Sequence, residues 1–426
     1  MMDNKSKHMK ANSIFLKTFI IKLLLLVANT SYAQDTAIYL MGGHAHLGNG
    51  KVVENSLICI EKGEITMVAD ATLIKINLQG KKVIDIYGKH VYPGIIAANT
   101  TIGLDEVEAV RATEDYYEVG EFHPSVRALI AFNTDSKVLP TLTTNGILVA
   151  QTTPQGGYIS GSSSIMNLSG WNWEDAQLKA DDGIHLWWPR KVAGSDGSFK
   201  DYEAAVDMIE KYVVDAKAYL AANMANKNLG FEAMKPLFSN AAKLYVHVNN
   251  AMEIIDMVAF CDEHQLTPIV YGGAEAYIVA DLLKSHKIPV ILSNVHDLPP
   301  RPGADVDLPY KMPKILKEKG VMFGLSCEGF WQTRNLPFFA GTAAAYGLTK
   351  EEALQAITGD MAKILGIDAT VGTLEQGKKA TLFVSEGDAL DMKSSKILKI
   401  FIQGKEINPE NFQTELYHKY HEKYGF

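Results

Sequence analysis

The sequence predicts an α/β protein in which a (β/α)8, TIM-like barrel is joined to a composite β-sandwich built from both flanks of the chain. Three observations lead to this prediction. Apolar strands alternate with helical patterns about every 25 residues between residues 200 and 347, as in a parallel sheet with helical crossovers. The span 91–365 has about 275 residues, which suits such a barrel. Strand-like segments bracket this span at 35–90 and 366–405.

The first flank contains short apolar segments separated by turn signals and no convincing helical pattern. Gly48-Asn49-Gly50 and Lys62-Gly63 are the clearest turns. The expected strands are 38–41, 56–60, 65–68 and 82–86. Residues 91–98 are apolar and punctuated by Pro93-Gly94, so we expect a buried strand that opens the barrel.

After residue 200, the barrel segment shows most clearly the alternation of short apolar strands with amphipathic helical patterns. One helical face carries Val206, Ile209, Val213, Ala216 and Leu220. The further expected strands are 244–248, 268–271, 289–292 and 321–325, and the further helices are 251–263, 274–284, 313–319 and 336–346. A doubly wound sheet is the alternative, but no glycine-rich dinucleotide fingerprint follows the first strand.

The second flank follows a helix that begins at a capping box, Thr349 to Glu352, and ends near Leu365. Strand patterns return after Gly366. Each flank alone is too short to bury a core, so we expect 35–90 and 366–405 to form one domain. Residues 406–426 form a C-terminal tail.

The N-terminal segment 1–33 has the pattern of a secretory signal peptide. Five lysines and one acid accompany an apolar run that ends at Ala28, and Ser31-Tyr32-Ala33 provides small residues before Gln34. The apolar run is shorter than the roughly 20 residues of a membrane span. We therefore expect a periplasmic or secreted protein with no membrane span after signal removal. The alternatives are an amphipathic tail and a retained anchor.

Charge and cysteine content exclude several function classes. The formal net charge is −8, from 41 basic and 49 acidic residues, and no basic run exists outside the N-terminus, so nucleic acid is not an expected partner. Cys59, Cys261 and Cys327 lie far apart and form no CxxC pair. This spacing supports neither a zinc ribbon nor a disulfide framework.

Several motifs together resemble one family. Residues 84–94 read Ile-Asp-Ile-Tyr-Gly-Lys-His-Val-Tyr-Pro-Gly, and residues 372–380 read Gly-Thr-Leu-Glu-Gln-Gly-Lys-Lys-Ala. With Arg334 to Pro337 and Glu352 to Thr358, they resemble the amidohydrolase superfamily, in particular the branch related to imidazolonepropionase. The resemblance implies a barrel with a β-sandwich and one or two divalent metal ions, usually zinc, at the C-terminal ends of the strands. It also implies hydrolysis of a carbon–nitrogen bond other than a peptide bond, in a cyclic amide or amide-like substrate.

The positions that the resemblance assigns to metal ligands are mostly replaced. After Pro93-Gly94 the family has His-x-His, whereas this chain has Asn99-Thr100-Thr101. His247 matches the single-histidine strand. Tyr271 stands where the next strand would end in histidine, and Glu328 stands where the last would end in aspartate. Neutral oxygens are poor zinc ligands.

Three interpretations of this site remain open. In the first, His247 and Glu328 hold a weakly bound divalent metal with help from water and Asn99. In the second, Glu328 is a base and His247 its acid partner without metal, while Asn99, Thr101 and Tyr271 orient water or substrate. In the third, the protein is a pseudoenzyme that binds a ligand on the retained scaffold. The partner is a small-molecule substrate or ligand in each case, and homo-oligomerisation stays open.

Other motifs carry weaker signals. His44-Ala45-His46 resembles a metal motif but precedes the barrel, so it is not the catalytic one. The glycine-rich stretch 156–164 lacks a phosphate-loop lysine and is expected to be a loop over the barrel. Four tryptophans between 171 and 188 surround His185 and form either a packing patch or an aromatic wall for a ligand.

Overall fold

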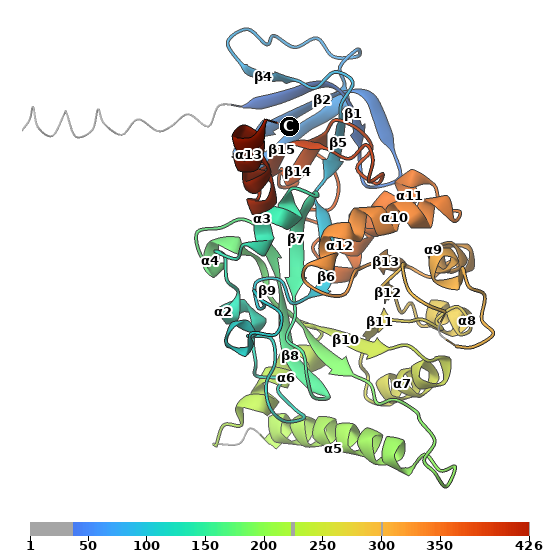
Figure 1. The fold of residues 1–426 in the computed structure, drawn as a ribbon. Helices are drawn as coiled ribbons and strands as arrows, with labels where there is room; N and C mark the ends of the chain where they lie inside the picture. Colours follow the sequence, from blue (N-terminus) through green and yellow to red (C-terminus); the bar gives the residue numbers. More distant parts are fainter. Residues whose placement is uncertain (1–36, 223–225, 300, 426) are drawn as a thin grey trace, which may run out of the picture.

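The computed structural model describes residues 37–222, 226–299 and 301–425 (Figure 1). The expected signal peptide, 1–33, lies outside the described residues. Among the helices of the described ranges, none is long and apolar enough to cross a membrane. The chain forms two eight-stranded sheets, one at the top of Figure 1 and one in the barrel below it.

The upper sheet, which we call the flank sheet, combines strands from both ends of the chain. Its order is β16-β15-β14-β5-β1-β2-β3, and β4 pairs with β1. Its strands are β1 (Ile38–His46), β2 (Val52–Glu61), β3 (Glu64–Asp70), β4 (Lys82–Asp85), β5 (His90–Pro93), β14 (Leu382–Ser385), β15 (Ile397–Ile402) and β16 (Lys405–Ile407).

The two flanks meet where β5 pairs antiparallel with β14, with Tyr92 opposite Phe383. Leu40 and Ile58 from the first flank share one buried cluster with Val384 and Phe401 from the second. The turn at Gly63 also lies against Gln403 of the β15–β16 turn. Strand pairing is continuous through the flank sheet, so the two flanks of the chain form one sheet over this shared core.

The barrel sheet has the order β13-β12-β11-β10-β9-β8-β7-β6. Its strands are β6 (Ile95–Thr100), β7 (Ile147–Thr152), β8 (Ile159–Asn167), β9 (Gln177–Trp187), β10 (Lys243–Val248), β11 (Pro268–Gly272), β12 (Val290–Leu292) and β13 (Phe323–Leu325). No ladder joins β6 to β13 among the described residues. Instead, Ser326 Oγ donates to the Ala98 carbonyl at 2.5 Å, and the Ile96 N–H donates to the Ile357 carbonyl at 2.9 Å.

One barrel strand departs from the expected pattern. β8 runs antiparallel to both β7 and β9, whereas the other adjacent strands pair parallel. The prediction of a loop over 156–164 was therefore wrong for residues 159–164. Every residue of β8 is buried, and Gly161 has no room for a side chain because the Val126 carbonyl lies against it. The composition of β8 suggested a loop although its residues form a tightly packed strand.

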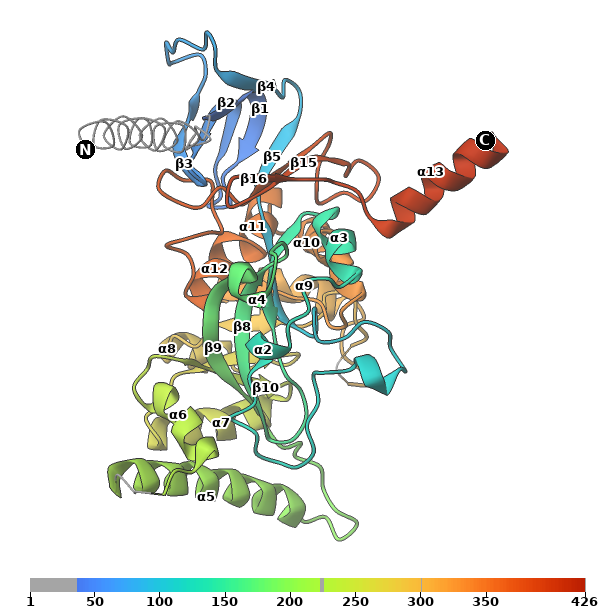
Figure 2. The same cartoon turned by 90° about the vertical axis from the view of Figure 1, so that its left-hand side faces the viewer.

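The described ranges contain α-helices and short 3-10 helices, most of which lie around the barrel sheet (Figure 1). They are η1 (Arg111–Thr113), α2 (Ala128–Ala131), α3 (Val138–Thr143), α4 (Trp173–Ala176), α5 (Lys200–Ala222), α6 (Leu229–Phe238), α7 (Ala251–Glu263), α8 (Ala280–Ser285), α9 (Leu308–Lys319), η2 (Gln332–Asn335), α10 (Leu336–Ala345), α11 (Lys350–Ala356), α12 (Gly359–Leu365) and α13 (Phe412–Tyr424). α5 lies across the end of the barrel opposite the flank sheet (Figures 1 and 2).

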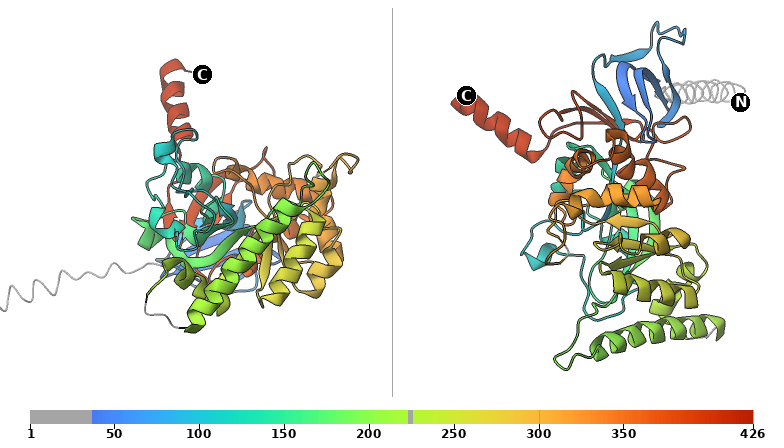
Figure 3. Two further views of the ribbon diagram at one scale, coloured as in Figure 1. Left: turned by 90° about the horizontal axis from the view of Figure 1, so that it is seen from below. Right: turned by 90° about the vertical axis from the view of Figure 1, so that its right-hand side faces the viewer.

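Local chemistry explains several helix boundaries. The predicted capping box at Thr349 and Glu352 starts α11. The helix expected to continue to Leu365 is instead broken at Ile357 and Thr358, whose backbone leaves the helical conformation, and α12 begins at Gly359. Gly359 lies so close to the Gly48 carbonyl that a side chain would clash there. α9 begins before the predicted residue 313, since Pro309 is accommodated in its first turn. The tail contains α13, which projects from the body and buries no residue (Figure 3).

Candidate functional site

The predicted site residues come from four strands of the barrel sheet. Asn99 lies in β6 with Thr101 just beyond it, His247 lies near the end of β10, Tyr271 lies in β11, and Glu328 follows β13. Strands β9 to β13 each pair parallel with the next, so their C-terminal ends lie at the same end of the barrel. We call this end the barrel mouth. Residues at such strand ends are the usual source of function in this type of barrel.

Asn99 is held in an uncommon backbone conformation. Its φ is 51°, in the left-handed region, and its N–H donates to Gln151 Oε1 at 3.0 Å. The Asn99 Oδ1 atom is buried and has no hydrogen-bond partner among the described residues. Thr101 is buried beside it, and its carbonyl accepts from the Leu104 N–H. The two residues that replace the family histidines are therefore neutral and largely enclosed.

His247 forms a pair with His185, which the sequence assigned only to a tryptophan-rich patch. His185 Nδ1 and His247 Nε2 lie 2.9 Å apart, so one proton is shared between them. Burial lowers the pKa of His247 to about 3, and burial together with His247 lowers the pKa of His185 well below its usual value. Both imidazoles are therefore neutral at physiological pH.

The neutral pair has a definite hydrogen-bonding capacity. With one proton between the facing nitrogens, the outer nitrogens are one donor and one acceptor, whichever tautomer is present. These outer atoms, His185 Nε2 and His247 Nδ1, are buried and have no hydrogen-bond partner within the described ranges. The Trp187 ring stacks on His247 with centroids 3.8 Å apart and planes inclined by 12°.

A second polar network lies next to the histidine pair. Asp182 is fully buried and accepts from Ser163 Oγ at 2.7 Å, Tyr245 Oη at 2.7 Å and Gln151 Nε2 at 2.9 Å. Burial raises the pKa of the Asp182 carboxyl, and these hydrogen bonds oppose that rise. The Tyr245 ring stacks on His185 with centroids 4.7 Å apart. The network thus supports both His185 and, through Gln151, the Asn99 backbone.

Tyr271 lies between the histidine pair and Glu328. Its ring is 4.9 Å from that of His247, centroid to centroid. Burial and then the charge of Glu328 raise the pKa of the Tyr271 phenol, while Asn99 and Ser326 near its hydroxyl lower it. The hydroxyl nevertheless lacks a well-formed hydrogen bond to the described residues. The structure therefore brings Asn99, Tyr271, His247 and Glu328 to the same mouth.

Two adjoining cavities open there. The first has a volume of about 440 Å³ and is bordered by Trp187, Trp188, Arg190 and His247. The second, about 370 Å³, is bordered by Ser293, Asp297 and Glu328. Asn249 and Ala274 border both cavities. No hydrogen bond joins Glu328 to His247, so the proposed acid–base pair is not in direct contact.

Comparison with known proteins identifies the relatives of this fold. The model of the amidohydrolase family matches residues 153–407. The chain belongs to the amidohydrolase family. A 109-residue stretch is 32% identical to the amidohydrolase tasK of Hapsidospora irregularis, and it represents 23% of this chain. The match spans only 11% of that relative's length.

Solved structures share the fold of this amidohydrolase-family protein at low identity. An amidohydrolase from Thermotoga maritima MSB8 is 21% identical, with a TM-score of 0.78 over 87% of this chain and 99% of that one. A prolidase complexed with N-methylphosphonate-L-proline is 15% identical, with a TM-score of 0.57 over 88% and 100%. The A. niger ochratoxinase is 14% identical, with a TM-score of 0.54 over 88% and 97%.

The family generally uses a divalent metal, but the mouth of this amidohydrolase-family protein does not fit one. No group of three or more His, Cys, Asp or Glu side chains suited to a metal ion occurs within 37–222, 226–299 and 301–425. The facing nitrogens of His185 and His247 bind each other, and Asn99 and Thr101 offer neutral oxygens. Glu328 lies on the second cavity, away from the histidine pair.

Proposed function

We propose that this amidohydrolase-family protein binds a small organic molecule at the barrel mouth and has lost metal-dependent hydrolysis. The observation that carries the proposal is the direct hydrogen bond between His185 Nδ1 and His247 Nε2. The bond engages one nitrogen of each imidazole, and only one of the two outer nitrogens keeps a free lone pair, so the neutral pair offers a metal ion a single nitrogen ligand. The buried Asn99 in place of a family histidine adds to this argument.

The lining of the first cavity suggests the class of ligand. Trp187 provides a planar aromatic surface beside His247, and Lys191 Nζ is already paired with Asp256 at 2.7 Å. Glu253 and Glu275 accept backbone N–H groups at 2.7 and 3.0 Å, so their carboxylates serve the protein itself. Arg190, the remaining charged residue of this lining, is exposed to solvent. These features favour an uncharged planar ligand. A cyclic amide is such a molecule, and it is also the class that the family resemblance implies.

Calorimetric titration with a set of cyclic amides tests this proposal. We expect at least one to bind, and Trp187→Phe to weaken its binding by about tenfold or more, because an aromatic contact in the cavity is reduced. Trp171→Phe is the matched control, since Trp171 is 90% exposed. Equal binding by wild type and both variants would place the ligand elsewhere, and no binding by any member of the set would count against the ligand class.

A second candidate function is hydrolysis without a metal, with Glu328 as the base. Burial and then the charge of Asp297 raise the pKa of the Glu328 carboxyl, which suits a general acid or base. The same titrations, followed by product analysis, separate the two candidates. Turnover that disappears in Glu328→Gln favours hydrolysis, whereas binding without turnover favours the pseudoenzyme.

A further inference from the structure

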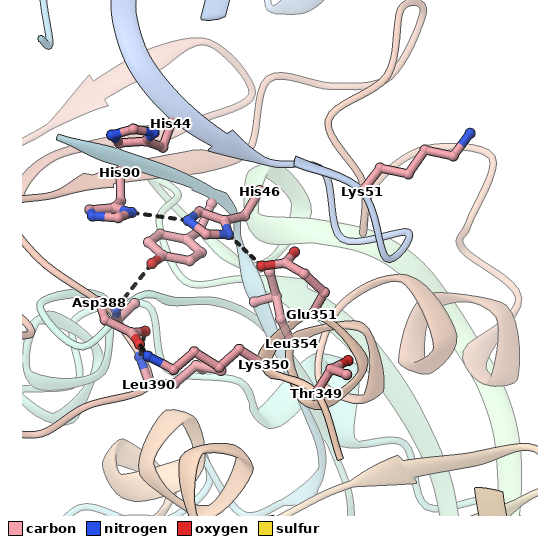
Figure 4. A network of polar contacts seen from close by, with 12 residues as sticks. His44, His46, Lys51, His90, Thr349, Lys350, Glu351, Leu354, Asp388 and Leu390 are labelled. Atoms are coloured by element: carbon pink, nitrogen blue, oxygen red, sulfur yellow. Dashed lines mark hydrogen bonds and ion pairs between the residues drawn. The ribbon is translucent and has the colours of Figure 1, made fainter. Parts of the chain in front are cut away.

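A cluster of three histidines lies where the flank sheet meets the barrel (Figure 4). His44 and His46 are on β1, and His90 is on β5 opposite His44 in the ladder. Because alternate residues of a strand point to the same face, the His44-Ala45-His46 motif places both imidazoles near His90. We call these three residues the histidine cluster.

His46 joins the cluster to the barrel. Its Nδ1 lies 2.6 Å from Glu351 Oε1 on α11, and its Nε2 lies 3.0 Å from His90 Nδ1. The side chains of His46 and Glu351 are only 15% and 20% exposed. The His46 ring also stacks on Tyr92, with centroids 4.4 Å apart and planes inclined by 4°. Figure 4 shows His46 between His90 and Glu351.

The geometry allows only some protonation states. A neutral His46 that donates from Nδ1 to Glu351 has a bare Nε2, which accepts from a neutral His90. One added proton is tolerated, because His46 can then donate to Glu351 and to the other tautomer of His90. A second added proton places an N–H on both facing nitrogens at 3.0 Å, and that contact must break.

Charged side chains from several neighbouring elements surround the histidine cluster. His44 Nδ1 pairs with Glu54 on β2 at 2.6 Å, and Asp388, after β14, is paired with Lys350 of α11. Lys89 and Lys396 both form ion pairs with Glu386, which lies two residues before Asp388 in the chain. The remaining Glu351 oxygen is buried and has no hydrogen-bond partner in the part of the chain that the structure describes. His46 is therefore the main partner of Glu351.

We propose that His46 and His90 form a pH-sensitive latch that holds the flank sheet on α11 and opens when both imidazoles carry a proton. The His46–Glu351 contact joins β1 of the flank sheet to α11, a helix that follows the last strand of the barrel sheet. Opening removes the His46–His90 hydrogen bond and displaces the buried ring stack on Tyr92. The expected result is a looser attachment of α11 under acidic conditions.

The direction of the pH effect follows from His90. Burial, then the charges of His46 and His44, lower its pKa, while Asp388 and Glu54 oppose that change. A histidine with a lowered folded-state pKa binds fewer protons in the folded than in the unfolded protein. Its contribution to stability is thus complete above the unfolded value near 6.5 and is lost as the pH falls below it.

Melting temperatures between pH 8 and pH 5 test the latch in the full chain. We expect wild type to lose about 3 °C more than His90→Gln over this range, because the glutamine cannot acquire the second proton. His418→Gln, an exposed residue of α13, is the matched control and should follow wild type. The His185–His247 pair adds the same pH dependence to all variants, so the difference isolates the cluster.

Hydrogen exchange of the α11 amides gives an independent measurement. After correction for intrinsic rates, exchange in α11 should rise at pH 5 in wild type but much less in His90→Gln. Glu351→Gln keeps the shape of the contact and removes its charge, so its acid transition should begin at a higher pH. Parallel melting curves for wild type and His90→Gln, or unchanged α11 exchange at pH 5, would overturn the latch.

Discussion

A chain truncated to residues 91–365 is expected not to form a stable barrel. The truncation removes Phe383, Leu390, Ile400 and Ile402, which belong to the same buried cluster as the barrel strands. The Phe383 ring is so close to Gly146 that any side chain at that glycine would touch it. Removing such packing exposes apolar surface and leaves a cavity, and both effects are destabilising.

Thermal unfolding followed by circular dichroism measures this effect. The truncated chain should lack a cooperative transition, or melt far below the chain of residues 34–426. Deleting either flank alone should also destabilise the protein, because β5 and β14 pair with each other. A truncated barrel that melts like the longer chain would show that the flanks form an independent domain.

Replacing Asp182 by alanine is expected to lower the free energy of unfolding by about 3–5 kcal/mol. Ser163, Gln151 and Tyr245 would each lose a buried acceptor, and unsatisfied buried donors are costly. Asp182→Asn should cost less, since it retains one acceptor oxygen and nearly the same volume. Chemical denaturation measures both values.

The control for this substitution is Asp281→Ala. Asp281 is 88% exposed, so its replacement should change the free energy of unfolding by less than about 0.5 kcal/mol. If Asp182→Ala were as mild as this control, the hydrogen bonds around Asp182 would not contribute to the support of the barrel mouth. His185 would then need a different explanation for its fixed position.

Elements of the fold were predictable where the apolar periodicity and a capping residue indicate the same helix boundary. α7 occupies the residues that the apolar pattern predicts, and Asn250 caps it. β8 was not predictable, because its serines and glycine have the composition of a loop while their burial between β7 and β9 depends on tertiary packing. β8 precedes residues 200–347, where the alternation of strand and helix on which the barrel prediction was based is present in the structure.

The site was predictable in part for a similar reason. His247 ends a recognisable strand, so its place at the mouth followed from the sequence. His185 was missed, although it lies near the end of the neighbouring strand and pairs in the ladder with Tyr245. Its strand runs for 11 residues and begins with polar ones, so it does not show a buried apolar pattern. His46 and Glu351 are 305 residues apart in the sequence, so local sequence patterns could not predict their contact.

The metal content of purified, zinc-exposed protein tests the loss of metal-dependent hydrolysis most directly. After removal of free zinc, mass spectrometry of the metal content should find far less than one ion per chain, with the same value for His247→Ala. Asn99 and Thr101 would contribute no binding because their oxygens are neutral. Zinc bound at one ion per chain or more in wild type, and lost in His247→Ala, would contradict the proposal and restore a metal-dependent hydrolase.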